Sequence, residues 1–174
     1  MSAIYEQEAD TSHRNSTLHI HPPLLAASLL VIGLLLHLIG GHHQHAFPFH
    51  QLLGLLLVAA GSGLSCYAAA LFAAGDTTKN PYGEPAAFVV APPYTVTRNP
   101  MYLGFTTILF GFATFFGSPA MLLAPIVFVV VIDHMIIPEE EKTMERLYGQ
   151  QYRVYKNRVA RWLPLPSLPR ASSS

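Results

Sequence analysis

The sequence predicts an all-α fold: an integral membrane bundle of four transmembrane helices with a C-terminal amphipathic cytoplasmic helix. Of the 174 residues, 51% are hydrophobic and only 11% are charged, with a mean hydropathy of +0.35. A soluble domain carries about 25% charged residues. Four long apolar segments follow one another along the chain, and beyond the last of them apolar residues recur with a helical period.

The four apolar segments cover residues 24–39, 52–74, 101–117 and 120–137. Each is close to the roughly 20 residues that cross about 30 Å of hydrocarbon at about 1.5 Å per residue. The second is rich in Gly, Ala and Ser, which allow close contact between membrane helices. The first begins after a polar stretch and no small-residue cleavage site follows it, so we expect it to remain as a span and not to be removed as a secretion signal.

Basic residues predict the orientation of the spans. The loop 40–51 and the turn 117–119 contain no Lys or Arg, so all ten basic residues lie in the other polar regions. By the positive-inside rule, both termini and the loop 75–100 face the cytoplasm. The formal net charge of zero gives no reason to expect nucleic acid as a partner.

The third and fourth segments should form a hairpin that returns the chain to the side from which it entered. Arg98 precedes this hairpin and three acidic residues, 139–141, follow it. We therefore expect the arginine and the acidic residues to be neighbours, as in a functional site at a membrane surface. Each flank also has a simpler interpretation as a helix start, with Asn99 as N-cap before Pro100, and with Pro138 before the acidic residues.

The stretch 142–164 predicts an amphipathic helix that is interrupted near Gly149. Two interpretations stay open: a surface helix at the lipid interface, or a helix that folds back as a lid over the mouth of the hairpin. Arg and Lys occupy its polar face. Its apolar face comprises Met144, Leu147, Tyr148, Tyr152, Tyr155, Val159 and Trp162.

Two stretches resemble a known family. "PPYTVTRNPMYLG" (92–104), followed by "PEEEKTMERLYGQQYRVYKNRV" (138–159), is similar to the C-terminal core of the isoprenylcysteine carboxyl methyltransferase and phospholipid N-methyltransferase superfamily. The resemblance implies a methyltransferase core over residues 75–164. Before it we expect a cytoplasmic tail (1–23) and two generic spans (24–74), and after it a disordered tail (165–174).

The resemblance also implies an integral membrane enzyme that transfers a methyl group from S-adenosylmethionine to a lipophilic or membrane-accessible acceptor. Arg98 and Glu140 are then the candidate catalytic residues. The extended piece 86–90 would form one wall of the cofactor pocket. The candidate cofactor-binding residues are Tyr94, Asn99, Pro100, Met101, Tyr102, Glu140 and Glu141.

The chemistry of S-adenosylmethionine agrees with these residue types. Its carboxylate suits a helix N-terminus with Arg98 beside it, and its ammonium and ribose groups suit a glutamate. Tyr94 and Tyr102 offer aromatic faces to a sulfonium cation. Methyl transfer is an in-line displacement, so alignment and the exclusion of water should supply most of the rate.

Two departures from the pattern bear on the acceptor. Many relatives carry His where this chain has Asn99, and the prenylcysteine enzymes carry an arginine where it has Ile136. That arginine would hold an acceptor carboxylate, so a prenylcysteine acceptor is disfavoured. Asp133 and His134 are unusual at their depth and are candidates for contacts to the acceptor.

The remaining reactive residues have simpler interpretations. The histidine-rich loop 41–50, with His42 to His45, has no carboxylate or thiol beside it, so we expect no metal site there. We expect His37 and Cys66 to be buried packing residues, and the lone cysteine excludes an internal disulfide. Gly104 would permit a close backbone approach between helices.

Two other functions stay open. An NADPH-dependent membrane reductase has a similar C-terminal architecture, but a 2′-phosphate should need more cations than Lys79 and Arg98 supply. A non-catalytic membrane scaffold or a small transporter would explain every motif as a helix cap. The sequence leaves the oligomeric state and the acceptor atom open.

Overall fold

The computed structural model describes residues 21–40, 48–77 and 91–164, except for the side chains of 75–77. These residues form an all-helical fold, as predicted, in which Thr97 and Ala160 make an isolated parallel β-bridge. The elements are α2 (Pro22–Ile39), α3 (His50–Thr77), α4 (Pro100–Phe115), the 3-10 helix η1 (Pro119–Leu122), α5 (Leu123–Val131), the π-helical turn η2 (Ile132–Ile136) and α6 (Ile137–Arg158).

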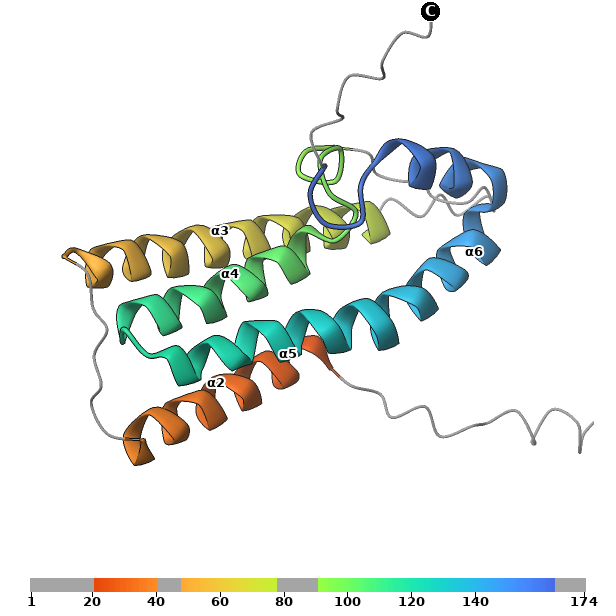
Figure 1. The fold of residues 1–174 in the computed structure, drawn as a ribbon. Helices are drawn as coiled ribbons and strands as arrows, with labels where there is room; N and C mark the ends of the chain where they lie inside the picture. Colours follow the sequence, from red (N-terminus) through yellow and green to blue (C-terminus); the bar gives the residue numbers. More distant parts are fainter. Residues whose placement is uncertain (1–20, 41–47, 78–90, 165–174) are drawn as a thin grey trace, which may run out of the picture.

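The helices lie side by side in the order α3, α4, α5, α2 (Figure 1). The run α5–η2–α6 extends beyond the other helices, and the last turns of α6 fold back next to the segment that leads into α4. The hairpin between α4 and α5 turns at Gly117, whose φ of 58° suits glycine. The predicted hairpin is thus present. Both of its ends lie near residues 159–164, which follow α6 and are called the C-terminal segment below.

Three helices are long and apolar enough to cross a membrane: Pro22–Ile39, His50–Ala74 and the continuous run Pro119–Arg158. Large apolar side chains on their outer faces, such as Val31, Leu52 and Val130, are exposed, as expected for lipid contact. α4 has only 16 residues. At about 1.5 Å per residue it is about 24 Å long, shorter than the roughly 30 Å of hydrocarbon. The fourth span therefore stays a prediction.

α3 and α4 approach each other closely. A Cβ atom added to Gly104 would lie 2.1 Å from Ser65 Oγ and 2.6 Å from the carbonyl oxygen of Gly61. Ser65 Oγ also donates a hydrogen bond to the carbonyl of Met101 at 3.0 Å. The small residues of the second apolar segment therefore serve helix contact, as the sequence predicts.

The predicted helix start at Pro138 is present only in part: α6 begins at Ile137 with Pro138 in its first turn, but the preceding helical run leads into it without a break. Pro138 lies in the first turn of α6, directly after η2, where the backbone N–H of Ile137 donates to the carbonyl of Ile132. A proline inside a regular α-helix collides with the carbonyl four residues before it, whereas the wider π-helical turn accommodates its ring. The last span and the amphipathic helix are consequently one continuous run.

The predicted interruption of the amphipathic helix lies at Gly149, which has φ 51° and ψ −121°. This kink divides the predicted apolar face. Tyr152 and Tyr155, after the kink, are buried, whereas Leu147, before it, is 59% exposed. The face therefore does not form one uninterrupted stripe.

The expectation that Cys66 is buried is wrong, because its side chain is exposed. α3 turns Gly61, Ser65 and Ala68 toward its neighbours, and the residue after Ser65 is rotated away by about 100°. His37 is half-buried and its ring lies 5.5 Å from that of Phe116. Residues 41–47, which hold most of the histidine-rich loop, and the tails 1–20 and 165–174 lie outside the described residues.

Candidate functional site

The segment before α4 is paired with the segment after α6. The backbone N–H of Arg98 donates to the carbonyl of Ala160 at 2.9 Å. Thr97 Oγ1 and Asn99 Nδ2 both donate to the carbonyl of Arg161, at 3.1 and 2.9 Å. Asn99 occupies the N-cap position of α4, as predicted, but its side chain makes no capping hydrogen bond. It binds the C-terminal segment instead.

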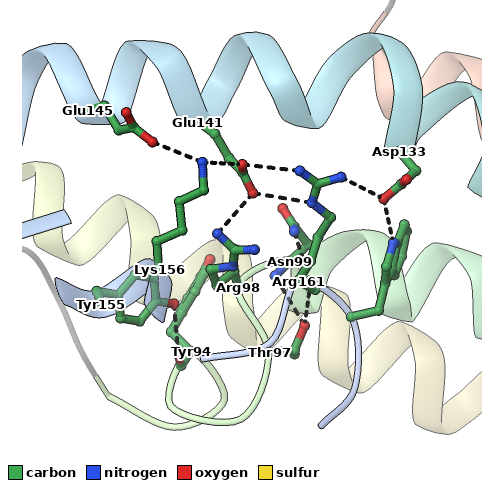
Figure 2. A network of polar contacts seen from close by, with 11 residues as sticks. Tyr94, Thr97, Arg98, Asn99, Asp133, Glu141, Glu145, Tyr155, Lys156 and Arg161 are labelled. Carbon is green, nitrogen blue, oxygen red and sulfur yellow. Dashed lines mark hydrogen bonds and ion pairs between the residues drawn. The ribbon is translucent and has the colours of Figure 1, made fainter. Parts of the chain in front are cut away.

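Arg98 and Glu141 meet where the hairpin returns to its starting side (Figure 2). Arg98 Nη1 lies 3.0 Å from Glu141 Oε1, and the two side chains are only 10% and 7% exposed. The predicted proximity of the arginine and the acidic residues is therefore present. Their roles in binding and catalysis stay predictions.

Glu141 accepts contacts from two further cations (Figure 2). Arg161 donates from Nε and Nη2 to the two carboxylate oxygens at 3.3 and 3.2 Å. Lys156 Nζ lies 2.9 Å from Glu141 Oε2 and also 2.9 Å from Glu145 Oε1. Three cations around one buried carboxylate hold it ionised and in place. Glu141 thus ties the start of α4 to the C-terminal segment.

Glu140 has different surroundings, although it is the adjacent residue. It is exposed, and its Oε1 accepts a hydrogen bond of 2.5 Å from the hydroxyl of Tyr102. Tyr102 belongs to α4 and is 6% exposed, so its ring is fixed by packing. Glu140 is exposed as a residue whereas Glu141 is only 5% exposed, so Glu140 is the member of the pair that is more open to a ligand.

Tyr94 links three parts of the structure. Its hydroxyl donates to the carbonyl of Ala68 in α3 at 3.1 Å, and its own carbonyl accepts from the hydroxyl of Tyr155 at 2.7 Å. Burial, together with the negative charge of Glu140, raises the pKa of the Tyr94 phenol above its usual value. The hydroxyl therefore stays protonated at neutral pH and remains a donor.

The other two candidate cofactor-binding residues lie against α3. Pro100 is fully buried, and the carbonyl of Met101 accepts from Ser65. Their observed contacts serve packing. The wall expected from residues 86–90 lies outside the described residues.

Two donor atoms of Arg98 lack a well-formed hydrogen bond to the described residues. Its Nε and Nη1 atoms are buried and make no hydrogen bond of acceptable geometry to the described residues, although Nη1 is close to Glu141. An unsatisfied buried donor costs about 1–3 kcal/mol, so such groups usually have a partner. A carboxylate suits a guanidinium in particular. Among the described residues, no group of His, Cys, Asp and Glu side chains could hold a metal ion.

Comparison with known proteins identifies the family of this chain. Residues 49–151 match the model of the phospholipid methyltransferase family. The chain belongs to this family. An uncharacterized protein of Haemophilus influenzae is 38% identical over 63 residues, which are 36% of this chain and the whole of that protein. No solved structure matches the chain.

Membership of the phospholipid methyltransferase family confirms the resemblance read from the sequence and gives methyltransferase activity in general. The matched range runs from the start of α3 to just beyond the kink in α6. It includes Arg98, Tyr102 and the acidic residues. Lys156, Arg161 and Trp162 lie outside it, yet they contact residues inside it.

Several residues of this candidate site were not predicted from the sequence. Arg161, Lys156 and Thr97 were not singled out, and Trp162 was placed only on an apolar face. A signal for Trp162 exists, because the N–H of a partly buried indole usually finds a hydrogen-bond acceptor. That acceptor is Asp133, whose Oδ1 lies 2.8 Å from Trp162 Nε1 and 3.3 Å from Arg161 Nη1. His134 is exposed, and its predicted contact to the methyl acceptor stays a prediction.

Proposed function

We propose that this protein is an integral membrane, S-adenosylmethionine-dependent methyltransferase that acts on a lipophilic acceptor reached from the bilayer. One observation supports it most: in a chain of a methyltransferase family, an arginine whose buried Nε makes no hydrogen bond to the described residues lies at the same end of the bundle as an exposed glutamate. These two groups are complementary to the carboxylate and the ammonium of the cofactor's amino acid part.

Arg98 would hold the cofactor carboxylate, since its Nε donor is buried and makes no hydrogen bond to the described residues, while Nη1 lies beside Glu141. Glu140 would accept hydrogen bonds from the ammonium or the ribose. Tyr94 and Tyr102 would offer aromatic surface near a cation. Four further residues would shape this region and hold it in place: Asn99, Pro100, Met101 and Glu141. When bound, S-adenosylmethionine supplies an electrophilic methyl group.

The chain's own contribution is binding, orientation and the exclusion of water. Tyr102 fixes the carboxylate of Glu140, and Glu141, which also binds Lys156 and Arg161, fixes Arg98. An exposed Glu140 is also placed to orient an acceptor or to take its proton. Prealigned reactants of this kind gain a large rate advantage without further covalent chemistry from the protein.

The membrane arrangement supports a lipophilic acceptor. Large apolar side chains cover the outer faces of the candidate spans next to the site. In this proposal the chain crosses the membrane four times, with α4 as the short fourth span, and both termini and the site are cytoplasmic. The acceptor atom is a nitrogen, an oxygen or a sulfur.

Incubation of the purified protein with methyl-labelled S-adenosylmethionine and a total lipid extract tests the activity, and the fraction that gains label identifies the acceptor class. We expect calorimetry to detect S-adenosylmethionine binding that weakens about tenfold or more in Glu140→Gln and in Arg98→Ala. Glu139→Gln is the matched control, because Glu139 is 64% exposed and pairs with Lys142.

Equal affinity in all four proteins, or binding of NADPH instead of S-adenosylmethionine, would show that the proposed function is wrong. Loss of binding in the control as well would show that the effect is not specific to the site. Thermal unfolding of each variant in detergent verifies that it is folded.

A further inference from the structure

Asp133 is the acidic residue whose position in an apolar helix most needs an explanation. It lies in η2, between the apolar helix α5 and the start of α6. A carboxylate at such a position is costly and usually marks a function. Its Oδ1 atom accepts from Trp162 Nε1 at 2.8 Å and from Arg161 Nη1 at 3.3 Å.

The π-helical turn determines the direction in which Asp133 points. Glu141 follows it by eight positions, which in a regular α-helix would rotate the two side chains about 80° apart. The i→i+5 hydrogen bond from Ile137 to Ile132 takes up one extra residue, and this reduces the offset to about 20°. Asp133 and Glu141 therefore share one face of the helix.

One guanidinium bridges these two carboxylates (Figure 2). Arg161 donates hydrogen bonds from Nε and Nη2 to Glu141 and from Nη1 to Asp133. Its backbone carbonyl accepts from Thr97 and Asn99, and the neighbouring Ala160 carbonyl accepts from the N–H of Arg98. The segment 160–162 is thus bound to the long helix by side chains and to the start of α4 by its backbone.

We infer that Asp133 is a positioning residue for methyl transfer that acts through Arg161. It fixes the guanidinium that holds Glu141, and it fixes the segment that holds the backbone of Arg98. This inference rests on the proposed function, because Arg98 is the group whose position matters to the cofactor. In this role Asp133 contacts Arg161 and Trp162 and need not touch the methyl acceptor, in contrast to the contact expected from the sequence.

The test is a double-mutant cycle on the full-length protein, with S-adenosylmethionine as the probe in calorimetry and in label transfer to a lipid extract. We expect Asp133→Asn to reduce the transfer rate or the cofactor affinity by about tenfold, because a displacement of about 1 Å at a positioned group can cost about 100-fold. In an Arg161→Gln background the same substitution should have little further effect, since Asp133 acts through Arg161. Glu139→Gln, an exposed carboxylate of the same helix, should leave both quantities unchanged.

Trp162 is the only tryptophan of the chain, so its fluorescence reports on the segment directly. We expect Asp133→Asn to shift the emission, because the indole N–H loses a charged acceptor. If Asp133→Asn does not fold, Arg161→Lys replaces it, since an ammonium carries all its N–H donors on one nitrogen and cannot span the two carboxylates as the guanidinium does. The same loss of rate or affinity is expected from this variant.

An Asp133→Asn penalty of equal size in both backgrounds would overturn the inference, as would wild-type rate and affinity in the single variant. Failure of the proposed function looks different. In that case the wild-type protein itself neither binds S-adenosylmethionine nor transfers label, and the inference falls with it.

Discussion

At the scale of the residue, two adjacent glutamates differ because of what surrounds each of them. Glu141 is buried among Arg98, Lys156 and Arg161, whereas Glu140 is exposed and accepts one hydrogen bond from Tyr102. A buried carboxylate within reach of three cations serves best to hold them. An exposed one remains available to a ligand. Glu141 therefore supports the site, and Glu140 is the member of the pair that can contact a ligand.

The hydroxyl of Tyr102 should matter to activity more than to stability. Tyr102→Phe keeps the buried ring but removes the donor to Glu140. A hydrogen bond to a charged group is worth about 1.5–3 kcal/mol, so we expect about a tenfold loss or more in cofactor affinity or transfer rate. Calorimetry and label transfer measure these quantities. The control is Tyr67→Phe, at an exposed position of α3; equal values for the two variants would contradict the prediction.

At the scale of the element, the packing of α3 on α4 depends on the absence of side chains. Gly104 has no room for a Cβ atom, because Ser65 Oγ and the backbone of Gly61 occupy that space. We expect Gly104→Ala to lower the free energy of unfolding by about 1–3 kcal/mol through overpacking. Thermal unfolding in detergent measures the change.

The matched control lies on α3 itself. A Cβ atom on Gly63 would meet nothing within 4 Å. Gly63→Ala should therefore leave stability unchanged or raise it by about 0.5–1 kcal/mol, because alanine is the better helix former. Equal destabilisation by both substitutions would refute close packing as the cause.

The kink in α6 depends on the backbone conformation of Gly149 and not on a lack of room for a side chain there. Gly149 has φ 51° and ψ −121°, yet a Cβ atom there would meet nothing within 4 Å. We expect Gly149→Ala to cost about 1–3 kcal/mol through backbone strain and to release the end of α6 from Tyr94 and Glu141. Limited proteolysis and Trp162 fluorescence should both report this release. Gln150→Ala, at an exposed position, should behave as wild type.

At the scale of the whole molecule, the two ends of the α4–α5 hairpin and the C-terminal segment meet at one end of the bundle. If the chain crosses the membrane four times, both termini lie on the same side of it. Because the hairpin ends meet the C-terminal segment, the site lies on that side as well. In a Cys66→Ser background, a single cysteine at Ser172 should react with an impermeant reagent only from the cytoplasmic side. A cysteine at Gln44 should react only from the opposite side. Labelling of both from the same side would contradict the proposed topology.

Several features of this protein are readable from the sequence because they depend on local chemistry. Runs of apolar residues predict helices that need a membrane, and the pair of apolar segments around Gly117 predicts a hairpin. A glycine within a helical pattern predicts the kink at Gly149. Since a hairpin returns to its starting side, the meeting of Arg98 with the acidic residues follows as well. These inferences require no knowledge of how any helix is rotated.

Helix rotation and long-range pairing depend on how the helices pack in three dimensions. Cys66 is exposed because α3 turns its small residues to α4, and Pro138 lies within a continuous helix because a π-helical turn precedes it. The same turn aligns Asp133 with Glu141, so that Arg161 binds both. A one-residue change in helical register rotates side chains by about 100°. Apolar periodicity does not record such a rotation, and for that reason the sequence alone left the division between Glu140 and Glu141 open.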